Sequence, residues 1–185
     1  MPVHVDPLMP VHPLTVTDVQ RMVAAGIIDE DDRVELLDGV LVELSPQSDP
    51  HMYAIRRLNA LALPAVAAAG MELSPQCPLG VRSPISQPEP DFAVIPRTPR
   101  DAKPADAVLV VEISQSSRQL DLGRKAELYA EADIPEYWVL DVKRRELIVH
   151  RDPRDGRYTS VRTLGEHDTA TAVAVDLAVP LAELL

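Results

Sequence analysis

The sequence contains little cysteine, few aromatic residues and no long apolar run. The single cysteine, Cys77, excludes an intrachain disulfide framework and a zinc site built from several thiolates, and it fits a reducing cytoplasm. Aromatic residues make up 3% of the chain, so we expect no stacking platform for single-stranded bases. No apolar run approaches the roughly 20 residues that span a bilayer, and the first residues lack the features of a secretory signal. These absences predict a soluble cytoplasmic protein with no membrane partner.

Positive charge is also scarce. Asp and Glu outnumber Lys and Arg by 29 to 18, which gives a net charge of −11. A field of that sign repels phosphate backbones and disfavours nucleic-acid binding through net charge, unless a local basic patch or bound cations override it. Lys143, Arg144 and Arg145 form one basic cluster in a predicted turn. We interpret them as solvated turn residues or, alternatively, as phosphate contacts.

Hydrophobic residues are plentiful. They make up 46% of 185 residues, enough to build the core of one ordinary domain. Residues 1–13 are rich in proline and histidine and predict a flexible N-terminal arm. We therefore expect this arm to be followed by a single domain over residues 14–185.

Sequence patterns predict both helices and strands along that domain. Capping residues and glycines predict helices over residues 15–26 and 48–70, with a hairpin between them that turns at Asp38-Gly39. Further strands are predicted within residues 72–82, 90–96 and 107–114, and a helix over residues 118–133. The segments "EYWVLDV", "ELIVH", "RYTSVR" and "TAVAV" then predict an antiparallel meander. The pattern indicates an α/β or α+β domain built on one sheet.

Charged residues interrupt two of the apolar patterns. The run "AVLVVEIS" predicts a central strand covered on both faces, yet it contains Glu112. In the following helix, Asp121 and Lys125 lie on the apolar face together with Tyr129, which we interpret as a core residue. Ionised side chains are rarely buried unless they are paired or bind a metal. These residues therefore either neutralise each other or build a site.

Asp91 completes a candidate catalytic set. It stands in "PEPDFAVI" at the start of another apolar strand. We interpret Asp91 and Glu112 as ligands of Mg²⁺ or Mn²⁺, with the ammonium of Lys125 orienting a water or neutralising developing charge. The alternatives are structural. Asp91 would be a turn residue, Glu112 would form a buried salt bridge with Lys125 or an arginine, and Asp121 would form an i,i+4 pair with Lys125.

The catalytic interpretation has consequences for geometry and stability. We expect Asp91 and Glu112 to lie on adjacent strands with their carboxylates converging on one cavity. Two close carboxylates repel until a cation binds, so a divalent metal should stabilise the fold. By the same argument, Glu112→Gln should raise the stability of the metal-free protein and abolish its response to metal.

Three stretches of the chain resemble successive motifs of the Uma-two family. They are "VELLDGVLVELSPQSDPH", "PEPDFAVIP" and "LVVEISQSSRQLDLGRKAELYAEADIPEYWVLDV", and the resemblance covers nearly the whole chain. It implies a restriction-endonuclease-like fold with the PD-(D/E)xK nuclease core, a mixed central sheet flanked by helices. It further implies that Asp91 and Glu112 bind the metal and that Lys125 is the catalytic lysine.

The resemblance extends to two supporting positions, Glu35 and His51, which match family positions near the site. Asp121 is a third candidate for a supporting role. The alternatives are a solvent-facing Glu35 on an edge strand and a His51 that serves only the first turn of its helix. In the broader nuclease pattern a lysine stands two residues after the acid, where this chain has Ser114. Lys125 must therefore reach back from the following helix.

Two functions follow from these expectations. The first is a Mg²⁺- or Mn²⁺-dependent endonuclease that hydrolyses phosphodiester bonds in DNA as a homodimer. The second is a catalytically silent interaction or regulatory module that keeps the nuclease fold as a scaffold.

Overall fold

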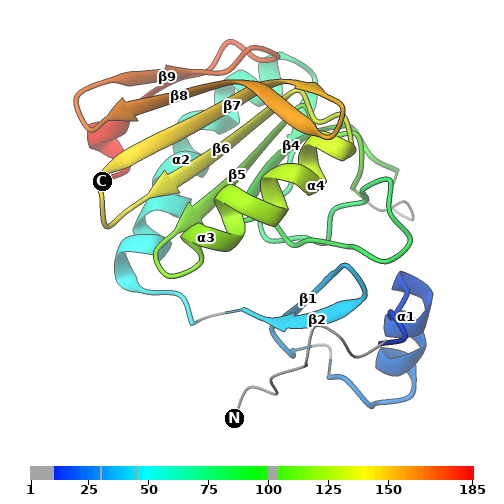
Figure 1. Cartoon of the computed structure of the whole chain (residues 1–185). Coiled ribbons are helices and arrows are strands. Elements are labelled where there is room, and N and C mark those ends of the chain that lie inside the picture. Colours follow the sequence, from blue (N-terminus) through cyan, green and yellow to red (C-terminus); the bar gives the residue numbers. More distant parts are fainter. Residues whose placement is uncertain (1–10, 30, 45, 100–103) are drawn as a thin grey trace. The chain divides into compact units, whose positions relative to one another are not determined.

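The protein is described by a computed structural model that covers residues 11–29, 31–44, 46–99 and 104–185 (Figure 1). It divides into two compact units. The N-terminal unit comprises Met1–Leu44 and Ser83–Gln87, and the core unit comprises Ser45–Arg82 and Pro88–Leu185. Most of the predicted arm, residues 1–10, lies outside the described residues. A single domain over residues 14–185 stays a prediction.

The described residues of the N-terminal unit include a helix and a hairpin. Helix α1 (Val16–Ala24) begins with a capping box, and strands β1 (Val34–Leu37) and β2 (Val40–Glu43) pair in antiparallel fashion. Asp38 and Gly39 have φ angles of 51° and 78°, the left-handed conformation that a two-residue hairpin turn requires at both positions. The predicted hairpin is confirmed.

The core unit is built on a six-stranded mixed sheet with the order β3-β4-β5-β6-β7-β8. Strands β5 and β6 are parallel, and every other neighbouring pair in this sheet is antiparallel. The strands are β3 (Met71–Leu73), β4 (Phe92–Pro96), β5 (Leu109–Ser114), β6 (Glu136–Asp141), β7 (Glu146–Arg154) and β8 (Arg157–Gly165). Strands β6 to β8 form the expected antiparallel meander.

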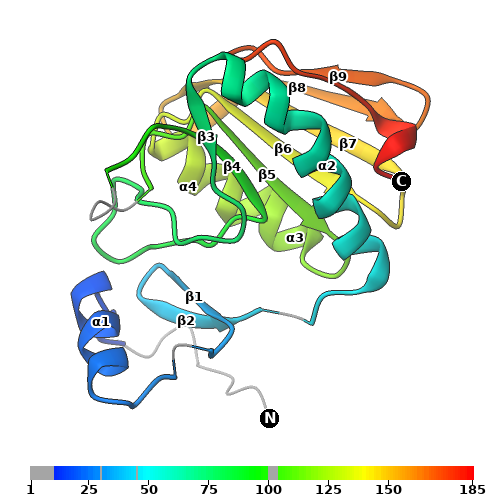
Figure 2. The same ribbon diagram turned by 180° about the vertical axis from the view of Figure 1, so that it is seen from behind.

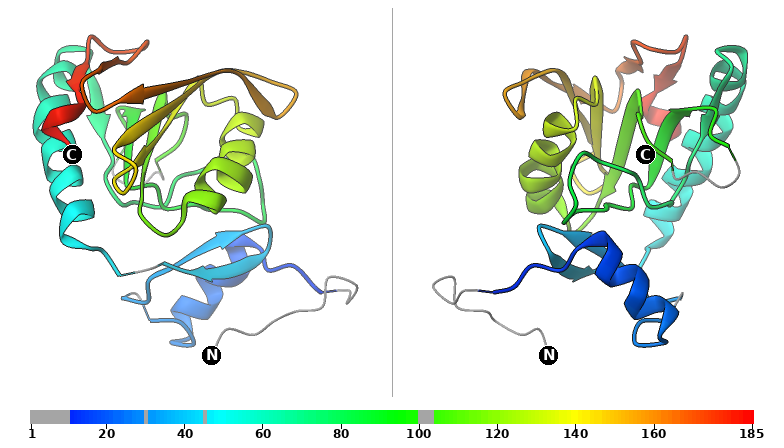
Figure 3. Two further views of the ribbon diagram at one scale, coloured as in Figure 1. Left: turned by 60° about the vertical axis from the view of Figure 1, so that its left-hand side comes forward. Right: turned by 90° about the vertical axis from the view of Figure 1, so that its right-hand side faces the viewer.

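Helices cover both faces of the core sheet. Helix α2 (Asp49–Ala68) lies on one face, in front of the strands in Figure 2. The other face carries α3 (Arg118–Leu120), a π-helical turn (Asp121–Lys125) and α4 (Ala126–Glu131). Figure 3 shows the strands edge-on between α2 and α4. Among the described helices, none is both long and apolar enough to cross a bilayer.

Side chains of β5 alternate between these two faces, as expected for a strand covered on both sides. Leu109, Val111 and Ile113 belong to the apolar cluster on the α2 side, and Val110 belongs to the cluster on the α4 side. Glu112 follows the alternation of Val110. The candidate acid therefore faces α4.

Three predicted elements differ in the structure. The strand expected within residues 72–82 is confined to β3, because Pro75 and Pro78 lack the backbone donors that a longer strand needs. The strand expected at "TAVAV" is replaced by β9 (Thr169–Thr171), which pairs with β10 (Ala178–Pro180). The helix expected over residues 118–133 contains the π-helical turn.

Candidate active site

Glu112 lies at the centre of a buried polar group in the core unit. Only 4% of the residue is exposed, and its Oε1 accepts hydrogen bonds from Lys125 Nζ at 3.0 Å and from the Tyr129 hydroxyl at 2.8 Å. Lys125 belongs to the π-helical turn and Tyr129 to α4. The lysine thus reaches back from the helix to the strand, as the sequence predicts. The geometry of the alternative, a buried Glu112–Lys125 salt bridge, is also present.

Asp91 immediately precedes β4, next to Glu112 on the neighbouring strand. Phe92 pairs with Val111, so extending the register by one residue sets Asp91 opposite Glu112. Asp91 Oδ2 accepts a hydrogen bond from the backbone amide of Ile113 at 2.8 Å. The structure therefore brings the two predicted metal ligands to adjacent strands.

His51 holds the same oxygen of Asp91 from the first turn of α2. Its Nε2 lies 3.0 Å from Asp91 Oδ2, and the two side chains are 12% and 15% exposed. Its Nδ1 is buried without a hydrogen-bond partner in the described part of the chain. Because a carboxylate oxygen accepts hydrogen bonds, Nε2 is the donor in this contact. His51 therefore orients Asp91 as well as occupying a helical turn.

Asp121 adds a third carboxylate to the group. It is 1% exposed, and Ser117 Oγ donates a hydrogen bond to its Oδ2 at 2.6 Å. Burial raises the pKa of Asp121 above its ordinary value, the charge of Lys125 and the Ser117 hydrogen bond oppose this rise, and the negative charge of Asp91 adds to it. Asp121 is thus electrostatically coupled to both Lys125 and Asp91.

The π-helical turn changes the expected relation between Asp121 and Lys125. A regular helix predicts an i,i+4 pair along its edge, whereas here both residues are buried and Lys125 forms an ion pair with Glu112 across to the sheet. Single π-helical turns inside α-helices often mark functional sites. Elsewhere along the same helical segment, Arg124 and Glu131 form an ion pair.

The carboxylates supply the hard oxygen ligands that Mg²⁺ and Mn²⁺ prefer. Within the described ranges, no group of three or more His, Cys, Asp or Glu is arranged to hold a metal ion. Mg²⁺ commonly binds only one or two carboxylates and completes its shell with waters and substrate phosphates. Asp91 and Glu112 fit that mode. A cation there would also relieve the repulsion between Asp91 and Asp121.

Glu35 and Tyr129 each show a feature that the sequence did not predict. Glu35 lies on β1 in the N-terminal unit and is 2% exposed, so the alternative of a solvent-facing residue is wrong, and its supporting role stays a prediction. Tyr129 packs in the core as expected, but its hydroxyl also binds Glu112. The sequence spacing could have predicted this contact, because Tyr129 follows Lys125 by four residues and therefore lies on the same helix face.

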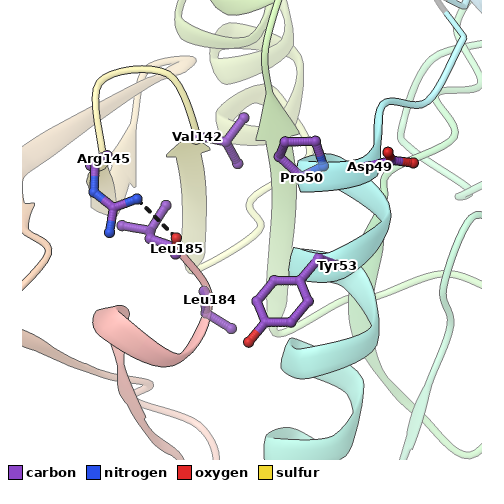
Figure 4. A pocket seen from close by; sticks show the side chains of 7 residues that line it. All are labelled: Asp49, Pro50, Tyr53, Val142, Arg145, Leu184 and Leu185. Carbon is purple, nitrogen blue, oxygen red and sulfur yellow. Dashed lines mark hydrogen bonds between the residues drawn. The ribbon is translucent and has the colours of Figure 1, made fainter.

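A separate pocket of about 400 Å³ opens at the start of α2 (Figure 4). Its lining includes Tyr53 of α2 and Arg145 of the turn after β6, and Arg145 Nη1 donates a hydrogen bond to Leu185 O at 2.8 Å. Asp91, Glu112 and Lys125 do not line it. The pocket is therefore distinct from the candidate active site.

Comparison with known proteins identifies the relatives of this chain. A family model described as "Uma2: Putative restriction endonuclease" matches residues 17–182. A crystal structure described as a putative nuclease belonging to DUF820 from Anabaena variabilis ATCC 29413 superposes with a TM-score of 0.71. The alignment covers 93% of this chain and 97% of that chain at 11% sequence identity, a likeness of fold. No match was found among curated proteins.

Proposed function

The chain belongs to the Uma2 family of restriction-endonuclease-like proteins, and we propose that it is a divalent-metal-dependent endonuclease that hydrolyses phosphodiester bonds in DNA. One observation carries this proposal. Lys125 pairs with Glu112 at 3.0 Å, and Asp91 stands opposite Glu112 on the neighbouring strand. This pairing and this register support a site of two acids and a lysine near the carboxyl end of β5.

Each residue of this group has a role that suits phosphodiester hydrolysis. A bound Mg²⁺ or Mn²⁺ would polarise a phosphoryl oxygen and lower the pKa of a bound water. Asp91 and Glu112 would hold the cation, with Asp91 kept in place by His51 and the Ile113 amide. Lys125 would neutralise charge that develops on the phosphate. Its ammonium has three donors, so it can bind Glu112 and a phosphate oxygen together.

DNA binding by an acidic protein requires local positive charge, and the turn after β6 supplies it. Asp141 Oδ1 accepts hydrogen bonds from the amides of Lys143 and Arg144 at 3.0 and 2.9 Å. The Val142 amide donates to Ser114 O, which ties this turn to the end of β5, two residues beyond Glu112. Lys143 and Arg144 are exposed. We propose that they contact phosphates beside the scissile one.

The proposal includes a homodimer in the cytoplasm. One active site cuts one DNA strand, so two active sites are needed to cut both strands. Two-fold dimers are also the commonest oligomers. Light scattering should then give twice the chain mass of 20.3 kDa. The single free cysteine supports a reducing compartment.

A specific observation also favours the second candidate, a catalytically silent interaction module. Glu112 and Lys125 neutralise each other in a buried pair, and the Tyr129 hydroxyl adds a further bond to the same carboxylate oxygen. Such a pair can be purely structural.

A cleavage assay separates the two functions. Wild-type protein incubated with supercoiled plasmid and Mn²⁺ or Mg²⁺ should convert it to nicked and linear forms, and a chelator should stop the reaction. Asp91→Ala should abolish cleavage. Glu131→Gln, on the exposed face of α4, is the matched control and should cleave like the wild type. Equal cleavage by wild type and Asp91→Ala, or none by the wild type with either metal, would exclude the endonuclease.

A further inference from the structure

A buried tyrosine on β6 contacts the π-helical turn that carries Asp121 and Lys125. Tyr137 is 0% exposed, and its hydroxyl donates a hydrogen bond to the backbone carbonyl oxygen of Asp121 at 2.9 Å. The carbonyl belongs to the first residue of the turn. The contact therefore ties the point where the helix leaves α-helical geometry to the central sheet.

The bond matters because a π-helical turn alters backbone pairing. The turn adds a residue, so hydrogen bonds run from i to i+5 and the ladder of the flanking α-helix is interrupted. A donor from a neighbouring element can then hold a backbone carbonyl of the turn in place. The Tyr137 hydroxyl is such a donor, fixed in direction by the strand beneath it.

The ring of Tyr137 is held by other aromatic side chains. Its centroid lies 4.9 Å from that of Tyr129, 5.4 Å from that of His150 and 6.1 Å from that of Tyr158. Tyr129 in turn donates to Glu112. Tyr137 is thus packed directly against one residue of the candidate active site and hydrogen-bonded to the backbone of a second.

We propose that Tyr137 is a positioning residue, whose hydroxyl holds the π-helical turn so that Lys125 is buried against Glu112. This inference rests on the proposed function for its catalytic consequence, but its structural part stands alone. Without the hydroxyl, the turn opens or relaxes toward a regular helix. Lys125 then spends more time away from Glu112.

The variant Tyr137→Phe tests this inference, with Tyr158→Phe as the matched control. Tyr158 belongs to the same aromatic group, and its hydroxyl donates to the Ile134 carbonyl, also at 2.9 Å. Both variants lose one hydrogen bond between a tyrosine hydroxyl and a backbone carbonyl, so thermal melts should show similar losses of stability. Only Tyr137→Phe removes the bond to the π-helical turn.

Amine labelling gives a readout that does not depend on activity. The side chain of Lys125 is 4% exposed, whereas Lys143 is exposed and serves as an internal reference. With an acylating reagent and peptide mass spectrometry, labelling of Lys125 relative to Lys143 should rise about fivefold in Tyr137→Phe, as expected when one hydrogen bond is removed from a local opening equilibrium. It should stay at the wild-type level in Tyr158→Phe. Equal protection of Lys125 in all three proteins would overturn the inference.

Deleting one residue of the π-helical turn also tests whether the turn holds Lys125 in its buried position. Removing Gly123 shortens the turn by one residue, and no side chain is lost. Lys125 labelling should rise although the Tyr137 hydroxyl remains, and unchanged labelling in a folded deletion variant would contradict the role of the turn.

Kinetics then connects positioning to catalysis. In a cleavage assay, Tyr137→Phe should lower kcat about tenfold with little change in KM, since it displaces a group that acts in the transition state, and Tyr158→Phe should be unaffected. If the wild type does not cleave DNA, the proposed function fails, and the labelling result still decides whether Tyr137 positions Lys125.

Discussion

The two ends of the parallel pair β5–β6 each bury a carboxylate, but they surround it differently. Glu136 begins β6 and is 1% exposed, and Glu112 lies toward the carboxyl end of β5 and is 4% exposed. Glu136 shares a sheet face with Trp138 of the apolar α2 cluster, and Glu112 faces α4. Burial alone therefore does not distinguish the structural carboxylate from the candidate catalytic one.

The partners do distinguish them. Glu136 Oε1 accepts from Trp138 Nε1 at 2.8 Å and from Arg151 Nε and Nη2 at 2.8 and 2.6 Å, and its Oε2 accepts from the Val173 amide at 2.8 Å. Both oxygens are bound by donors from three parts of the chain. This carboxylate joins β6, β7 and the segment after β9. Its arrangement is that of a structural cross-link.

Glu112, by contrast, lies among groups that can titrate or bind cations. Its partners are an ammonium and a phenol, and two further carboxylates, Asp91 and Asp121, belong to the same electrostatic group. Ligand sites in α/β sheets also concentrate at the carboxyl ends of parallel strands. A cluster of like charges at that end lowers the stability of the fold. Such a cluster is expected where the carboxylates bind a metal or a substrate.

The largest effect on stability is expected at the structural end. Glu136→Ala removes the counter-charge of Arg151 and the acceptor of the Trp138 indole, so it should lower the free energy of unfolding by about 3–5 kcal/mol. Chemical denaturation measures this change. Stabilisation by millimolar Mn²⁺ should persist in this variant, and a loss below 1 kcal/mol would remove the distinction between the two carboxylates.

Glu112→Gln should have a smaller effect, of opposite sign to the expectation from sequence. Repulsion between Asp91 and Glu112 alone predicts a gain, but the ion pair at 3.0 Å means that the substitution leaves Lys125 without its counter-charge. We expect a loss of about 2–3 kcal/mol, reduced because glutamine can still accept from Tyr129. Thermal melts with and without Mn²⁺ should also show that metal no longer stabilises the variant. A gain in stability of Glu112→Gln would mean that the attraction between Glu112 and Lys125 does not offset the cost of burying their charges.

Asp121 gives a smaller effect with a defined pH dependence. Because burial raises its pKa, the folded protein keeps the proton to higher pH than the unfolded chain does. Stability is therefore greatest below the ordinary pKa and falls as pH rises through the raised one. Asp121→Asn lacks this loss, so at neutral pH it should be more stable than the wild type by about 1 kcal/mol.

Unfolding curves of wild type and Asp121→Asn over a pH series measure that difference directly. The difference between the two proteins should grow as pH rises and then level off. A difference that is constant across the series would show that Asp121 does not titrate differently in the folded state.

The smallest effect concerns the exposed turns at the two ends of the sheet. Lys143→Gln, in the turn after β6, should reduce DNA affinity a few-fold and lower the slope of log K against log salt by about 1. Arg154→Gln, at the exposed end of β7 beside the turn to β8, should leave both unchanged. Equal losses in both variants would indicate diffuse electrostatics instead of a local contact.

The sequence predicts the helices and strands better than the contacts between side chains that lie far apart in the chain. The Asp38-Gly39 hairpin, the capped helix α2 and the apolar strand β5 follow from local chemistry, which is why their positions agree with the structure. The continuous apolar run of β5 also predicted that Glu112 lies in a strand covered on both faces. The grouping of Glu112 with Lys125 was also predicted, because both residues interrupt apolar patterns.

Other features depend on contacts that local patterns do not carry. The partners of Glu136 come from Arg151 and Val173, which lie 15 and 37 residues away. The π-helical turn adds one residue within a pattern that otherwise fits a regular helix, and its stabilising hydroxyl comes from β6. The separate N-terminal unit depends on the return of residues 83–87, a short loop segment with no periodicity of its own.

Lys125 decides whether the group around Glu112 is catalytic. The direct measurement is the cleavage rate of wild type, Lys125→Met and Lys125→Arg on one DNA substrate with one metal, with folding verified by thermal melts. Methionine keeps much of the volume of the stem and removes the charge, and arginine replaces a compact ammonium with a planar fork. We predict that cleavage falls at least about 100-fold in Lys125→Met and is restored little in Lys125→Arg. Equal rates for wild type and Lys125→Met would contradict the account and leave Lys125 as the structural partner of Glu112.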